Sequence, residues 1–94
     1  MPDARHLARM FQALSVEPRV RILLLLKEKA LCVNALAARL GMTSSAVSLH
    51  LRILRAADLV TPDKRGYYVH YALNPATLRR WQGQIGRLLE IGQE

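Results

Sequence analysis

The side chains whose types and spacing in this sequence point to chemistry or binding are hydroxyls, cations and one thiol, Cys32. Hydroxyls both donate and accept hydrogen bonds, and cations pair with carboxylates or phosphates. Two clusters of such side chains therefore suit the recognition of a polar or anionic partner. The first cluster comprises Thr43, Ser44, Ser45, Ser48, Leu49 and Arg52, and the second comprises Lys64, Arg65 and Gly66.

A catalytic site is not expected from these residues. The chain has no glycine-rich phosphate loop, no paired carboxylates in a plausible cleft and no nucleophile beside a base. Ser48 and His50 are two residues apart, and side chains at that spacing on a helix point in different directions. The sequence therefore predicts a binding protein and not an enzyme.

Charge and size narrow the class of partner. The chain has 94 residues, which predicts a single domain over residues 1–94. Lys and Arg number 14 against 7 Asp and Glu, so the formal net charge is +7. On a chain this small, that balance favours nucleic acid first and an anionic membrane surface second. Hydrophobic residues make up 51% of the chain, which indicates a globular domain and not a disordered one.

The cysteine content and the length of the apolar runs indicate the cellular compartment of the chain. A single cysteine excludes an intramolecular disulfide and a four-cysteine zinc site within one chain. The longest apolar run, 22–26, is far shorter than the roughly 20 residues that a membrane span needs. The start at Met1–Asp3 shows no basic region followed by an apolar run, so no signal peptide is expected. These features predict a cytoplasmic chain with no membrane partner.

The spacing of apolar residues and capping residues predicts the elements that hold the two clusters. Helices are expected over residues 4–14, 18–29, 33–40, 43–57 and 75–91. Ser15 is expected to cap the second helix, Gly41 to end the third and Thr43 to cap the fourth. The third and fourth helices, joined by a tight turn containing glycine, are typical of a helix-turn-helix.

After the fourth helix the apolar period changes from helical spacing to alternation. Residues 59–61 and 67–73 predict two strands, and residues 62–66 predict the turn between them. A β-hairpin directly after a helix-turn-helix is the layout of a winged helix. The expected fold class is therefore mainly α with a small β-hairpin (α+β), with five helices and a two-stranded wing.

Several strings of the chain carry a family resemblance when they are taken together and in order. They read FQALS at 11–15, RVRIL at 19–23, LCVNALA at 31–37, SAVSLHLRIL at 45–54, ADLV at 57–60 and KRGYYVHYAL at 64–73. Over roughly residues 7–74 this series resembles the ArsR/SmtB repressors. The resemblance implies a homodimeric winged-helix transcriptional repressor. Many members of that family release their operator when a toxic metal, a metalloid or another inducer binds.

Combined with the expected layout, the resemblance makes residues 43–57 the candidate recognition helix. The first turns of such a helix enter the major groove and present their outward side chains, here the first cluster, to base edges. Arg52 could bind guanine or a phosphate, while the second cluster would contact phosphates or the minor groove from the wing tip. Relatives usually carry a polar residue at Leu49, which leaves two interpretations open, contact with thymine methyls or partial burial. Arg19, Arg21 and Arg39 are weaker candidates for backbone contacts.

Metal sensing is where the sequence departs from the family. The resemblance implies two cysteines one residue apart, and Cys32 matches the first, but Asn34 stands at the second. A second zinc site of the family uses Asp and His on the last helix, and residues 75–94 contain neither. We therefore expect no metal site of either kind. Two roles stay open for Cys32. It could be a half-buried core residue, or it could be a sensor thiol that reacts with an oxidant or binds a thiophilic metal or metalloid.

The first and last predicted helices carry apolar stripes that a small domain cannot fully bury. The stripes predict a two-fold dimer interface, and the operator of such a dimer should be an imperfect inverted repeat in double-stranded DNA. A nonspecific nucleoid-type module and a protein-binding winged-helix adaptor are the alternatives. The residues predicted in the dimer interface are Leu7, Phe11, Trp81, Ile85 and Leu88.

Overall fold

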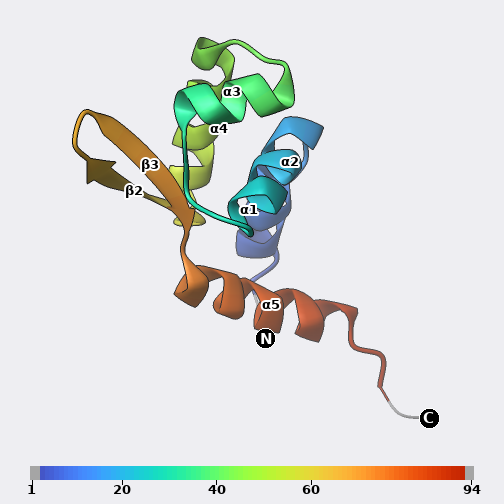
Figure 1. The fold of residues 1–94 in the computed structure, drawn as a ribbon. Helices are drawn as coiled ribbons and strands as arrows, with labels where there is room; N and C mark the ends of the chain where they lie inside the picture. Colours follow the sequence, from blue (N-terminus) through green and yellow to red (C-terminus); the bar gives the residue numbers. More distant parts are fainter. Residues whose placement is uncertain (1–2, 93–94) are drawn as a thin grey trace.

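A computed structural model describes residues 3–92 and contains all five predicted helices. They are α1 (Ala4–Ala13), α2 (Glu17–Leu26), α3 (Val33–Leu40), α4 (Ser44–Ala56) and α5 (Pro75–Leu89). Three short strands accompany them: β1 (Leu31–Cys32), β2 (Val60–Arg65) and β3 (Tyr68–Leu73). The hairpin of β2 and β3 extends to one side of the helices, and α5 runs beneath them (Figure 1). The winged helix-turn-helix prediction is confirmed.

The sheet has one strand more than the sequence predicts. It is antiparallel with the order β1-β3-β2, so the predicted two-stranded wing of β2 and β3 is present and a third strand, β1, pairs with it. In β1, Leu31 lies opposite Tyr71 and Cys32 lies opposite His70. A strand of two residues is too short to show an alternating pattern, which is why the sequence did not reveal it. Through β1, the start of α3 is joined to the wing.

The turn at the wing tip is shorter than predicted. Strand β2 continues to Arg65, which pairs with Tyr68, so only Gly66 and Tyr67 form the loop and the predicted turn over 62–66 is wrong. Gly66 has a φ of 62° and Tyr67 does not have a positive φ, which is the pattern of a type II′ hairpin turn. Pro62 fits within β2 because β2 is an edge strand, where a missing N–H is tolerated.

The helix ends agree with the predicted caps in part. The Thr43 hydroxyl accepts a hydrogen bond from the Ala46 N–H at 3.1 Å, as expected for the cap of α4. The prediction for Ser15 is wrong, because Val16 is the N-cap of α2 and the Ser15 hydroxyl donates backwards to the Gln12 carbonyl at 2.8 Å. Helix α5 ends at Leu89, two residues before the expected end.

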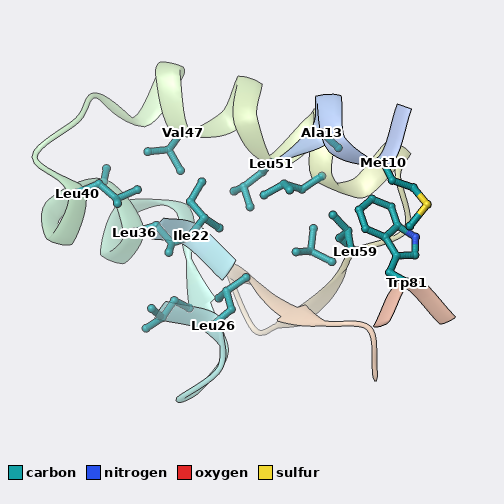
Figure 2. Close-up of a cluster of buried hydrophobic side chains, with 14 of the residues drawn as sticks. Met10, Ala13, Ile22, Leu26, Leu36, Leu40, Val47, Leu51, Leu59 and Trp81 are labelled. Atoms are coloured by element: carbon teal, nitrogen blue, oxygen red, sulfur yellow. The ribbon is translucent and has the colours of Figure 1, made fainter. Parts of the chain in front are cut away.

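The core fills the space between the helices and the base of the wing. Leu36 and Leu40 lie at one end of it, and Trp81 and Met10 lie at the other (Figure 2). Leu7 and Trp81, which the sequence predicts in a dimer interface, are already buried inside the single chain. Both residues belong to the core of the single chain, and their part in a dimer interface stays a prediction. Within residues 3–92, none of the helices has the length and apolar character needed to cross a membrane.

Substitutions at Gly41 test whether the turn between α3 and α4 requires a glycine. It caps α3 with φ 67° and ψ 34°, and a Cβ built there meets nothing within 4 Å. Only backbone strain opposes a side chain, so Gly41→Ala should lower the free energy of unfolding by about 1 kcal/mol. Gly41→Asn should cost less, since asparagine tolerates the left-handed region. Urea denaturation of both variants measures the difference, and an alanine variant as stable as the original chain contradicts the explanation.

Candidate nucleic-acid interface

Helix α4 has a buried face and an exposed polar face. Its buried residues are Val47, Leu51 and Leu54, which recur at helical spacing and pack into the core. The predicted recognition residues lie at the N-cap of α4 and on its exposed side, and every one of them is exposed. They are Thr43, Ser44, Ser45, Ser48, Leu49 and Arg52.

Leu49 lies on this exposed face and not in the core. Its side chain is 56% exposed, so partial burial does not explain why an apolar residue stands there. An apolar side chain between hydroxyls is suited to contact with a thymine methyl group. Of the two interpretations left open by the sequence, the structure is consistent with the one that involves base contact.

The start of α4 is anchored to α3 by a side-chain hydrogen bond. The Ser44 hydroxyl donates to Asn34 Oδ1 at 3.0 Å. Asn34 therefore connects the first turns of the two helices of the helix-turn-helix. Ser45 and Ser48 have no such partner within residues 3–92, and their hydroxyls are free to bond with another molecule. Sequence reasoning assigned the three serines one shared role, and the structure separates Ser44 from the other two.

The wing tip presents the second cluster and an aromatic side chain that the sequence analysis did not select. Lys64, Arg65 and Gly66 are all exposed. Arg65 Nε lies 3.1 Å from Asp63 Oδ2 in an exposed ion pair, so part of its charge is compensated. Tyr67 is 100% exposed at the turn. Its position directly after the turn glycine is the sequence signal that could have revealed it.

Arg19 is corrected from a candidate DNA contact to a buried structural residue. Its Nε donates to the Ala13 carbonyl at 2.6 Å, and its Nη2 donates to the Gln12 carbonyl at 3.0 Å. Its Nη1 lies 3.3 Å from His50 Nδ1. A guanidinium can only donate, so Nδ1 of His50 accepts and Nε2 carries the ring proton. Arg19 thus joins the end of α1 to α4.

Cys32 lies where α3 meets the wing. Its thiol is half-buried, and the residue is the N-cap of α3 without a side-chain hydrogen bond to the helix. It lines a small hollow of about 250 Å³ together with Asn34 and residues of the wing. His70, opposite Cys32, has a buried Nδ1 without a hydrogen-bond partner among residues 3–92. In the same part of the chain, no three His, Cys, Asp or Glu residues gather closely enough to hold a metal ion.

The remaining residues of the predicted dimer interface lie on the outside of the chain. Phe11 on α1 and Leu88 on α5 are exposed, while Ile85 is partly buried against the core. Two more large apolar side chains, Leu89 and Ile91, are exposed at the end of α5 and just beyond it. The second half of α5 thus carries an apolar surface that its own chain leaves uncovered.

Comparison with known proteins gives the same assignment as the fold. Residues 17–61 match the family described as "Bacterial regulatory protein, arsR family". The chain is 42% identical over 79 residues to the HTH-type transcriptional regulator CmtR of Mycobacterium bovis, covering 84% of this chain and 67% of CmtR. It is 40% identical over 77 residues to the arsenical resistance operon repressor of Escherichia coli, covering 81% of this chain and 65% of that repressor.

A solved structure extends the likeness over the whole chain. It is the homodimeric winged helix-turn-helix DNA-binding domain of Mb0332 from Mycobacterium bovis. It superposes with a TM-score of 0.72 at 25% identity and covers 100% of this chain and 95% of that one. Since fold, family match and relatives agree, the chain belongs to the arsR family of bacterial regulatory proteins.

Proposed function

We propose that this chain is a homodimeric, sequence-specific DNA-binding repressor that an inducer releases from its operator. The observation that carries the proposal is the exposed face of α4, where Ser45, Ser48 and Arg52 are presented to solvent beside a basic wing. The net charge of +7 suits a polyanionic partner. The alternatives, a nonspecific nucleic-acid-binding module and a protein-binding adaptor, require no particular pattern on α4.

The cluster on α4 and the cluster at the wing tip contact different parts of the DNA. The first two turns of α4 enter the major groove, where Ser45 and Ser48 bond with base edges and Arg52 bonds with guanine or a phosphate. From the wing, Lys64 binds phosphate and Tyr67 reaches the adjacent minor groove. This function contains no catalytic step. Because bacterial DNA lies in the cytoplasm, the protein would act there.

Dimerisation would pair two such surfaces. The apolar surface at the end of α5 and Phe11 of α1 are exposed in the single chain, and a two-fold contact would cover them. The related Mb0332 domain is a homodimer. Two recognition helices related by a two-fold axis bind half-sites about one helical turn apart, roughly 34–36 Å. An imperfect inverted repeat is the expected operator.

The dimer is tested by placing a charge in the proposed interface. Leu88→Glu should weaken dimerisation about 100-fold, because an unpaired carboxylate would be buried against apolar side chains. Sedimentation of the variant over a range of concentrations measures the change. Ala76→Glu adds the same charge at an exposed position in the first turn of the same helix and should leave the dimer intact. If both variants sediment like the original chain, α5 does not form the interface.

The repressor function is tested by fluorescence anisotropy with two duplexes, one taken from the DNA upstream of the protein's own gene and one of random sequence. We expect tight binding to the first and weak binding to the second. The double change Ser45→Ala and Ser48→Ala should lower operator affinity about tenfold and leave random-duplex affinity almost unchanged. An equal loss on both duplexes would contradict the assigned role of α4. Equal, salt-sensitive binding of the unmodified chain to both duplexes would favour the nonspecific alternative.

A further inference from the structure

A cavity of about 570 Å³ lies between α1, the last turn of α4 and α5, on residues that the DNA-binding surface does not use. Its size falls in the range of small-molecule sites. Its apolar lining includes Met10 from α1, Ile53 from α4 and Trp81 from α5. Met10 and Trp81 lie together at that end of the core (Figure 2).

The charged lining of this cavity is predominantly cationic. Arg9 on α1 and Arg80 on α5 line it and are exposed, while the buried Arg19 forms part of its wall. One carboxylate, that of Asp58, also lines the cavity. Within residues 3–92 the ion pair of the structure is Arg65 with Asp63, so Asp58 does not form a salt bridge with Arg9 or Arg80. The positive charge at the mouth of the cavity is thus only partly offset.

We propose that this cavity binds a small organic anion, with an aromatic or aliphatic body on the exposed Ile53 beside Trp81 and a carboxylate on Arg80 and Arg9. An apolar floor contributes affinity through burial, and a guanidinium binds a carboxylate through two parallel hydrogen bonds. A neutral ligand of the same shape would leave the two guanidiniums without a partner. The site therefore selects for negative charge as well as for shape.

The same site is placed to regulate DNA binding, a consequence that rests on the proposed repressor function. Ala56 and Ala57, at the end of the recognition helix, line the cavity together with α1 and α5. Helix α4 ends there in a Schellman motif, in which the Leu59 N–H bonds to the Leu54 carbonyl and the Asp58 N–H bonds to the Arg55 carbonyl. Asp58 has a φ of 61°, an uncommon conformation for a residue other than glycine. A bound anion would touch both the DNA-reading helix and the helices of the proposed dimer face.

The binding site is tested on the full chain without DNA, by calorimetric titration with naphthalene-2-carboxylate and with the neutral naphthalene-2-carboxamide. The carboxylate should bind about tenfold more tightly than the amide. The chain has one tryptophan, so its single indole N–H resonance reports whether the ligand lies beside Trp81. That resonance should shift on addition of the carboxylate.

The carboxylate affinities of three variants, each with one charge removed, show which side chains bind the ligand. Arg80→Gln should weaken carboxylate binding about tenfold, and Asp58→Asn should strengthen it severalfold because it removes a repulsive charge and keeps a residue that tolerates the left-handed region. Arg79→Gln is the matched control, since Arg79 is exposed on the same helix but does not line the cavity. It should leave the affinity unchanged.

Several results would overturn the proposal. Equal affinity for the carboxylate and the amide would show a site without selectivity for anions. An equal loss in Arg79→Gln and Arg80→Gln would show general surface attraction. Absence of both heat and an indole shift at millimolar carboxylate, with a native circular dichroism spectrum, would show that nothing binds. Operator binding is measured on the same ligand-free samples, so a failure of the repressor function is seen separately from a failure of the anion site.

Discussion

Replacing Arg19 with alanine is expected to lower the free energy of unfolding by about 3 kcal/mol. The guanidinium is buried and donates to the carbonyls of Ala13 and Gln12 at the end of α1, and it contacts His50 on α4. Of these acceptors, the Ala13 carbonyl has no other donor in the loop that follows α1. The variant leaves the carbonyl of the buried Ala13 without this donor and opens a void between three helices. Thermal and urea unfolding curves measure the loss.

Arg21→Ala is the matched control for this prediction. Arg21 stands two residues further along α2 and is exposed, so its loss should change stability by less than about 0.5 kcal/mol. Arg19→Lys should fall between the two, because an ammonium group keeps the charge but cannot reach three acceptors in one plane. If Arg19→Ala and Arg21→Ala are equally stable, the three contacts of Arg19 do not hold α1 to α4.

Placing a carboxylate at Ser48 is expected to lower operator affinity about 100-fold or more. Ser48 lies in the middle of the exposed face of α4, with Ser45 one turn before it and Arg52 one turn after it. Ser48→Glu would put a negative charge against the base edges and phosphates of the major groove, and would also compensate the charge of Arg52. The side chain is exposed, so the fold should be retained. Anisotropy titrations at one fixed salt concentration measure the effect.

Ala76→Glu is the control that distinguishes the effect of a carboxylate on α4 from the effect of a lower net charge. It adds the same carboxylate side chain at an exposed residue in the first turn of α5, away from the exposed face of α4 and from the wing tip (Figure 1). A carboxylate is favourable near the start of a helix, so the variant should fold normally. It should lower operator affinity less than about threefold, as expected for a small change in the overall charge. Equal losses in the two variants would mean that binding follows net charge, and that α4 does not enter the groove.

The parts of the fold that could be predicted from the sequence are those determined by neighbouring residues. Helix α3 has the predicted bounds, since Gly41 stops it, and α4 begins at the predicted cap because the Thr43 hydroxyl acts within one turn. The exposure of the recognition residues followed from helical spacing, once Val47, Leu51 and Leu54 were placed inside. Nothing beyond a single helix was needed for these predictions.

Features that depend on distant contacts could not be predicted in the same way. Strand β1 exists because residues 31–32 meet residues 70–71 across the fold, and a two-residue segment carries no pattern of its own. Arg19 looked like a surface cation in sequence, and only the placement of α1 and α4 around it explains its burial. The stripe on α5 contained both core and surface residues, and spacing alone could not separate the buried Trp81 from the exposed Leu88.

The short strand β1 has a mechanical consequence. It leads directly into α3 and pairs with β3, while Asn34 of α3 holds the start of α4 through Ser44. The recognition helix and the wing are thus connected through β1 and α3, and we expect them to move as one rigid unit. A signal received at α1 or α5 would then leave the contacts of each recognition helix and wing with their half-site unchanged. It would act by altering the distance and angle between the two DNA-binding units of the proposed dimer. The two recognition helices would then no longer match successive turns of the DNA.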